Sequence, residues 1–192
     1  MRILVPLLVT LMLSACQNSS IQGAASPPLA NGLTGSLNVS LQTMTMGSFG
    51  LHYADTGETG QPTIVFVHGA QGSWRSLSRV MDQPELQQRA RLVSIDRPGW
   101  GGSPLLDKET EGSFTEQVKL IEPLLARLKS EADGQPLILV GHSYGASISS
   151  YIAYKHPQLV DGLLMASGAI GPELGKPRWY NRAAARCGRC PA

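Results

Sequence analysis

One serine of this sequence has neighbours that could make it a nucleophile. Ser143 lies between Gly141 and Gly145, where an apolar run stops and a helix-like pattern begins. A serine at the tip of a strained strand-to-helix turn needs small residues two positions away on each side, because the backbones crowd there. The two glycines meet this need. The spacing therefore predicts a nucleophile elbow, with the Ser143 hydroxyl presented for attack on a carbonyl carbon.

A serine hydroxyl also needs a histidine to take its proton and an acid to orient that histidine. The only histidine after Ser143 is His156, 13 residues downstream. An intervening helix of that length would carry it well over ~10 Å away, so we expect His156 at a surface helix end. His142 adjoins the serine and is expected to pack or to line the site. His52 falls in a predicted edge strand, where a structural role is favoured.

Three acidic residues are candidates for the orienting acid, and none is favoured. Asp161 would begin a strand at the end away from Ser143, whereas Glu173 follows the last predicted strand. Asp96 is expected to fix its own loop, which is rich in glycine and proline. Trp100 in that loop fits either a pocket lining or ordinary packing.

The elements that would position these residues alternate along the chain, which predicts an α/β fold with a mostly parallel sheet. About six strands are expected, with helices on both faces. The strand patterns are two antiparallel strands within 39–55 and single strands at 63–67, 92–95, 136–140 and 160–166, and the helical patterns are 73–81, 113–128 and 146–156.

The longest predicted helix has a clear start and an awkward interior. Ser113 followed by Glu116 is a capping-box pattern. Pro123 predicts a kink or a break, because proline removes a backbone hydrogen bond and clashes with the preceding turn.

The elbow, the His68-Gly69 pair after strand 63–67 and the DRPGWGGS loop at 96–103 together resemble the α/β-hydrolase family over roughly residues 44–171. The resemblance implies an oxyanion hole made by the main-chain amides of Ala70, or less favourably Gln71, and of Tyr144. It also implies that the side chain of His68 is structural.

The same resemblance implies a serine hydrolase that cleaves an ester or related acyl bond through an acyl-enzyme on Ser143. Members of the dehalogenase and epoxide-hydrolase branches place aspartate at the elbow, so serine disfavours them, whereas a haloperoxidase-like activity stays open. The rival interpretation is a non-catalytic, membrane-tethered fragment or binding protein that keeps the scaffold without the triad.

The C-terminal region departs from the family pattern. A lid, the last two strands and the later acid and histidine are missing, so we interpret residues 39–175 as the N-terminal part of the domain and 176–192 as an atypical tail. A frameshift or a truncated gene model would explain such a tail. Cys187 and Cys190 form only a weak redox or metal pattern. Leu163 and Leu164 would become an unpaired apolar edge.

The first residues read as a bacterial export signal. Residues 1–15 have a positive start and an apolar run too short to span a bilayer, and LSAC resembles a lipobox in which Cys16 is lipidated. An ordinary signal peptide is the alternative. Gln17 resembles the sorting residue of outer-membrane lipoproteins, which would face the periplasm. Residues 16–38 would then form the lipidated end and a flexible tether.

The composition limits the classes of binding partner that we expect. The net charge is +2 and charged residues make up 16%, which leaves no basic stripe for nucleic acid. No metal-ligand spacing and no cofactor motif is expected, and the predicted partners are a small acyl or ester substrate and a membrane. The hydrophobic fraction of 42% suits one globular domain, and the oligomeric state stays open.

Overall fold

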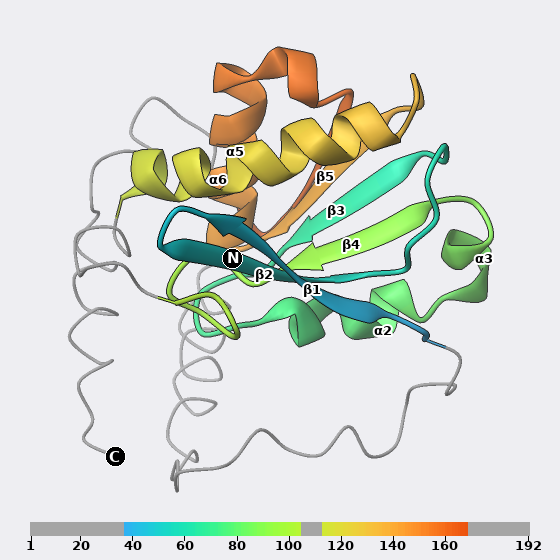
Figure 1. Cartoon of the computed structure of the whole chain (residues 1–192), viewed down its shortest axis with the longest axis horizontal. Helices are drawn as coiled ribbons and strands as arrows, with labels where there is room; N and C mark the ends of the chain where they lie inside the picture. The colour runs from blue at the N-terminus through green and yellow to red at the C-terminus, as the bar shows by residue number, and fades with distance from the viewer. Residues whose placement is uncertain (1–36, 105–112, 169–192) are drawn as a thin grey trace, which may run out of the picture.

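The computed structural model describes residues 37–104 and 113–168, and these form a single mixed sheet flanked by helices (Figure 1). Cys16, Glu173, Cys187, Cys190 and the tail 176–192 lie outside the described residues. Within them, the strand order is β1-β2-β4-β3-β5-β6. The strands are β1 (Ser40–Met46), β2 (Phe49–Asp55), β3 (Thr63–Val67), β4 (Arg91–Ile95), β5 (Leu137–His142) and β6 (Gly162–Ala166).

The sheet is antiparallel at one side and parallel through its centre. β1 pairs antiparallel with β2, and β2 antiparallel with β4, whereas β4, β3, β5 and β6 pair in parallel with one another. The central strands β3 and β4 are buried along nearly their whole length, which explains their continuous apolar runs. The predicted α/β fold, mostly parallel sheet and approximate strand number are confirmed.

Helices cover both faces of the sheet, as expected (Figure 1). On one face lie α5 (Phe114–Glu131) and α6 (Tyr144–Lys155), and the short η2 (Pro157–Leu159) follows α6. On the other lie η1 (Trp74–Leu77), α2 (Ser78–Met81) and α3 (Pro84–Gln87). The single helix predicted at 73–81 is therefore wrong, because the chain forms a 3-10 turn capped by Ser73 before α2 begins. The sequence patterns also missed α3.

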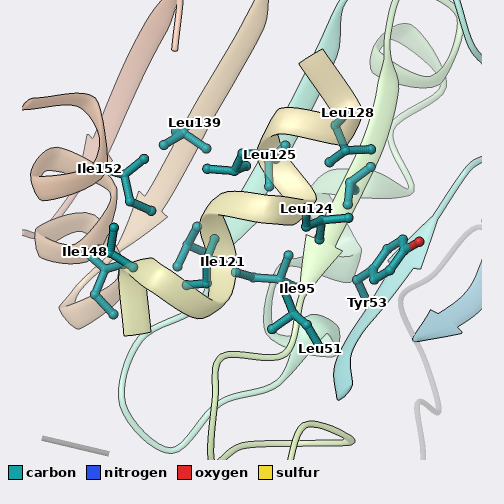
Figure 2. Packing of buried hydrophobic residues seen from close by; sticks show 14 of the residues in the cluster. Leu51, Tyr53, Ile95, Ile121, Leu124, Leu125, Leu128, Leu139, Ile148 and Ile152 are labelled. Atoms are coloured by element: carbon teal, nitrogen blue, oxygen red, sulfur yellow. The ribbon is translucent and has the colours of Figure 1, made fainter. Parts of the chain in front are cut away.

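The longest helix, α5, supplies one side of the main core. Its start at Ser113 is confirmed, since the Ser113 hydroxyl accepts a hydrogen bond from the Glu116 amide at 3.3 Å. A break at Pro123 is wrong, because α5 continues through it. Figure 2 shows why: apolar side chains on both sides of the proline enter one cluster with β2, β4, β5 and α6, so their burial outweighs the proline penalty. The labelled members from α5 are Ile121, Leu124, Leu125 and Leu128.

β6 forms one edge of the described sheet. Leu163 is 39% exposed and Leu164 is 55% exposed, which agrees with the apolar edge expected there. Successive residues of a strand point to opposite faces, so neither face of β6 is fully covered by the described residues. Among the helices of residues 37–104 and 113–168, none is both long and apolar enough to cross a membrane.

Candidate active site

Ser143 stands at a sharp reversal between a strand and a helix. β5 ends at His142 and α6 begins at Tyr144, which leaves Ser143 with φ 52° and ψ −120°. A positive φ at a residue other than glycine costs on the order of 1–3 kcal/mol and persists only where the surroundings enforce it. Here the Ser143 amide donates to the Ala166 carbonyl of β6 at 2.8 Å, and the Ser143 carbonyl accepts from the Ala146 amide at 3.0 Å. These bonds hold the turn in place.

The two glycines beside the serine have no room for a side chain. A Cβ on Gly141 would lie 2.4 Å from the Ala146 Cα atom. A Cβ on Gly145 would lie 2.2 Å from the Val67 carbonyl oxygen and 2.4 Å from that of His68. All of these contacts are with backbone atoms. The glycine requirement inferred from the sequence therefore has a steric basis: α6 approaches β5 closely at Gly141 and the end of β3 closely at Gly145.

The loop after β3 adjoins the serine. A Cβ placed on Gly69 would lie 3.0 Å from the Ser143 Cβ, so the two backbones nearly touch. Ala70 follows directly and is exposed, and Gln71 has a positive φ of 56°. Tyr144 opens α6, where the partial positive charge of a helix N-terminus favours an anion. The elbow and the loop that carries Ala70 thus meet, and the donor roles of Ala70 and Tyr144 stay predictions.

His68 is buried beneath this loop and has both ring nitrogens engaged. Its Nδ1 lies 2.7 Å from the Gly69 carbonyl oxygen, and its Nε2 accepts the Arg97 backbone amide at 3.0 Å. Burial, followed by the nearby Arg97 charge, lowers the pKa of His68 to about 4. A neutral imidazole with its proton on Nδ1 satisfies both bonds. The ring is therefore structural in this geometry and is not available as a base.

Asp96 is the hub of the glycine-rich loop, as expected from the sequence. Its Oδ1 accepts the Trp74 amide at 2.5 Å, and its Oδ2 accepts the Gly102 amide at 2.8 Å and lies 2.7 Å from His52 Nδ1. The Ser103 hydroxyl donates to the Asp96 carbonyl at 2.7 Å and accepts the His52 amide at 2.9 Å. The sequence patterns missed His52 as a partner, because the contact depends on β2 pairing with β4.

This His52 and Asp96 pair is a histidine-carboxylate pair, but it is not next to the serine. Asp96 follows β4 and Ser143 follows β5, and β3 lies between those strands. Two strand spacings of about 4.8 Å place Asp96 roughly 10 Å from Ser143, and His52 on β2 lies one spacing further away. The pair therefore ties β2 to the loop after β4 and does not activate Ser143.

The remaining histidines are also not joined to the nucleophile. His142 is exposed, which excludes the packing role and leaves the lining role. His156 is the C-cap of α6, with its Nδ1 2.9 Å from Glu122 Oε1, and the 12 residues of α6 separate it from Ser143. All four histidines of the sequence fall in the described residues, and none of them hydrogen-bonds to the Ser143 hydroxyl there.

The other sequence candidates lie apart from the elbow. Asp161 accepts the Leu137 amide at 2.6 Å, at the opposite end of β5 from Ser143, and its hydrogen bond with Lys129 lowers the pKa of its carboxyl. Trp100 is half-buried, with the Arg97 guanidinium 5.6 Å from its ring centre. The described part of the chain contains no group of three or more histidine, cysteine or acidic residues that could hold a metal ion.

Arg97 is the residue that sequence inspection overlooked. It is 1% exposed, and its guanidinium donates to the carbonyl oxygens of His68 and Gly69 and to Gln117 Oε1, at 2.9, 3.0 and 2.9 Å. The sequence feature that could have indicated its role is its position next to Asp96, in a loop between two elements predicted to be buried. A charge buried in such a place needs dedicated acceptors, and the backbone around the serine provides two of them.

Comparison with known proteins gives one family match. The sequence profile described as "Alpha/beta hydrolase family" matches residues 64–189, which begins within β3 and includes both the elbow and the loop after β3.

Individual relatives are distant and much longer. The chain is 33% identical over 116 residues to 1-acylglycerol-3-phosphate O-acyltransferase of Arabidopsis thaliana, covering 57% of this chain and 26% of that protein. It is 27% identical over 117 residues to human Epoxide hydrolase 4, covering 59% of this chain and 30% of that protein. The chain thus spans only about a quarter to a third of the length of these relatives.

Solved structures share the fold. An epoxide hydrolase from Vigna radiata superposes with a TM-score of 0.62 at 21% identity, over 79% of this chain and 46% of that one. A thioesterase domain from the curacin biosynthetic pathway superposes with a TM-score of 0.59 at 23% identity, over 79% of this chain and 53% of that one. At such identities the similarity concerns the architecture alone.

Proposed function

Since this chain belongs to the α/β hydrolase family, we propose that it is a serine hydrolase that forms an acyl-enzyme on Ser143 with an ester or related acyl substrate. The observation that carries the proposal is the backbone of Ser143, held at φ 52° and ψ −120° between two glycines that no side chain could replace without a clash. Strain of this kind is maintained at functional sites, and a serine that only packed or capped a helix would not require it.

In the proposed reaction the Ser143 oxygen bonds to the acyl carbon while its proton passes to a base. The tetrahedral oxyanion is held by the amides of Ala70 and Tyr144. Its collapse breaks the bond between the acyl carbon and the alcohol oxygen, which takes the proton from the base, and leaves the acyl-enzyme. Water then gives a proton to the base and bonds to the acyl carbon, and the Ser143 oxygen leaves with that proton, which frees the acid and regenerates Ser143. Two preorganised amide donors stabilise charge that develops only in the transition state, and loss of one costs about 3 kcal/mol.

The names of the relatives support acyl chemistry only in general terms. One is named an acyltransferase, and others are named 2-hydroxy-6-oxononadienedioate/2-hydroxy-6-oxononatrienedioate hydrolase and epoxide hydrolase. The epoxide-hydrolase branch is disfavoured for this chain because serine occupies the elbow position that holds aspartate in that branch. A serine at the elbow, as here, is itself a nucleophile that can carry an acyl group.

A fluorophosphonate probe tests the proposal directly, because it phosphonylates only activated serines. The wild-type chain should label, the Ser143→Ala variant should not, and Ser150→Ala should label like the wild type. Ser150 is a suitable control because it is buried in α6 and its hydroxyl bonds to the Ser147 carbonyl of the same helix. Labelling that survives in Ser143→Ala would refute Ser143 as the nucleophile.

A second candidate function is a non-catalytic, membrane-tethered binding protein or fragment. It is favoured by one observation, the absence of any bond between the Ser143 hydroxyl and a histidine within the described residues. This candidate predicts no labelling of any variant, provided that circular dichroism shows a folded wild-type chain.

We also propose that the chain is anchored to a bacterial membrane by a lipid. Residues 1–15 would be removed as a signal peptide, and Cys16 would carry the lipid, with Gln17 favouring the outer membrane. The support is the sequence alone, since these residues lie outside the described ranges. The 23 residues of segment 16–38 would hold the hydrolase domain on the order of 25 Å from the anchor.

A further inference from the structure

We propose that Arg97 is a positioning residue for the oxyanion site, which orients and polarises the peptide unit that carries the Ala70 amide. The inference rests on the proposed function, because it takes Ala70 as an oxyanion donor. It adds a buried cation from the loop after β4 that acts on the loop after β3 and does not touch the substrate.

The geometry of the Gly69-Ala70 peptide carries the first step. The Gly69 carbonyl oxygen accepts Arg97 Nη2 at 3.0 Å and His68 Nδ1 at 2.7 Å. No cis peptide bond occurs among the described residues, so this unit is trans and its C=O and N–H point in opposite directions. Two donors that hold the carbonyl therefore also fix the direction of the Ala70 N–H, which points away from Arg97 and His68.

The preceding residue is held by the same side chain. Arg97 Nε donates to the His68 carbonyl at 2.9 Å, and the Arg97 amide donates to His68 Nε2 at 3.0 Å. Arg97 thus makes three bonds to the His68-Gly69 segment, and the His68 ring closes a fourth within it. This arrangement leaves the loop little rotational freedom just before Ala70, even though Ala70 itself is exposed.

The positive charge of Arg97 has an effect on the Gly69-Ala70 peptide beyond fixing its orientation. A cation bonded to a peptide carbonyl draws electron density through the amide, which makes the N–H of that peptide a stronger donor. The guanidinium also lies 4.8 Å from the centre of the Tyr144 ring, and that ring stacks on Phe114 with centres 5.0 Å apart. Arg97 therefore contacts both residues whose amides are assigned to the oxyanion hole, one through its peptide and the other through its side chain.

A lysine and a methionine at position 97 separate these contributions. Arg97→Met keeps an unbranched side chain and removes every side-chain donor and the charge, whereas the backbone amide that bonds His68 Nε2 stays. Arg97→Lys keeps the charge but cannot bond both carbonyls in the guanidinium geometry. Arg91→Lys is the matched control: Arg91 is also buried, bonds Asp55 and Glu131 and precedes Arg97 by 6 positions at the far end of β4.

Two measurements on the full chain test the inference. The first is the second-order rate of fluorophosphonate labelling, corrected for the folded fraction. The second is the amide resonance of Ala70 in protein labelled with nitrogen-15 alanine, identified by its loss in Ala70→Gly. The labelling rate should fall at least about tenfold in Arg97→Met, toward the 10²–10³-fold loss seen when an oxyanion donor is removed. Arg97→Lys should recover part of it.

The Ala70 amide proton should shift and exchange faster in Arg97→Met and should not change in Arg91→Lys, even if Arg91→Lys is less stable. A wild-type labelling rate in Arg97→Met would overturn the inference. If the wild-type chain does not label at all, the proposed function fails. The orienting role of Arg97 is then decided by the Ala70 resonance alone, and an unchanged resonance in Arg97→Met and Arg97→Lys would overturn it.

Discussion

At Ser143 the backbone is strained, and its immediate neighbours determine whether that strain is tolerated. The close approach of α6 to β3 leaves Gly145 against the Val67 and His68 carbonyl oxygens. His68 is in turn held by hydrogen bonds from Arg97, so close contacts and hydrogen bonds connect the residues around the serine. At the residue scale, glycine and histidine are therefore as decisive for the elbow as the serine itself.

Gly145→Ala should lower the free energy of unfolding by at least about 1–3 kcal/mol, the usual cost of overpacking. Alanine ordinarily stabilises a helix by about 1 kcal/mol relative to glycine, so the sign of the change is informative. Here the added Cβ would sit 2.2 Å from the Val67 carbonyl, and backbone must move.

Urea unfolding measures this change. Gly162→Ala is the control, because its Cβ would meet only the Ile138 side chain at 3.4 Å, an ordinary contact. An unchanged or higher stability of Gly145→Ala would contradict the steric argument.

His68 should make stability depend on pH in a defined window. Its pKa is lowered from 6.5 to about 4 in the folded chain, so the unfolded chain binds the proton first as the pH falls. The contribution of neutral His68 to the free energy of unfolding is complete above about pH 6.5. It is lost progressively as the pH falls to about 4, and the loss is on the order of 3 kcal/mol.

The measurement is urea unfolding of wild type and His68→Gln between pH 4 and pH 7.5. The variant should be less stable at neutral pH, and its stability should fall less steeply over the window. Carboxylates titrate in both proteins, so only the difference between the two profiles counts. Parallel profiles would contradict the assignment of a neutral buried imidazole.

At the element scale, α5 shows how packing overrides a local preference. Pro123 lies inside a continuous helix, although it removes one backbone hydrogen bond. The apolar face of α5 meets β2, β4, β5 and α6 in one cluster (Figure 2). Burial of several leucine and isoleucine side chains, at about 1.5–3 kcal/mol each, exceeds the penalty for one proline.

Pro123→Ala should therefore raise the free energy of unfolding by about 2–3 kcal/mol. The helix penalty of about 3 kcal/mol is relieved, less about 0.4–1 kcal/mol because the unfolded chain gains freedom. Thermal or urea unfolding would show it. Ala126→Gly, at an exposed position of the same helix, should lower stability by about 1 kcal/mol and confirms that α5 is formed. A destabilised Pro123→Ala would contradict this account.

At the scale of the whole molecule, the chain combines a folded sheet with a proposed membrane anchor. Lipid attachment contributes about 0.8 kcal/mol per buried methylene, so a multiply acylated Cys16 would hold the domain firmly at a bilayer. The described residues add no spanning helix.

Cys16→Ser should abolish incorporation of radiolabelled palmitate and move the chain from the membrane fraction of bacterial cells to the soluble one. Cys190→Ser is the control, because it removes a cysteine near the other end and should leave both properties unchanged. Palmitate incorporation that persists in Cys16→Ser would contradict lipidation at this residue.

Local sequence by itself determined the parts of this protein whose signals lie within a few residues. The strand before Ser143, the glycines around it, the start of α5 at Ser113 and the loop organised by Asp96 could all be predicted, because each depends on short-range sterics or hydrogen bonds. The α/β class followed from the alternation of strand and helix patterns.

Only the tertiary structure decided which distant residues meet. His52 reaches Asp96 across 44 positions, and Arg97 reaches the Gly69 carbonyl across 28, because β4 pairs with both β2 and β3. A side chain carries no local signal of such a partner. The same strand order places the buried guanidinium against the peptide before Ala70, and this contact is what extends the site at Ser143 beyond the motif that first marked it.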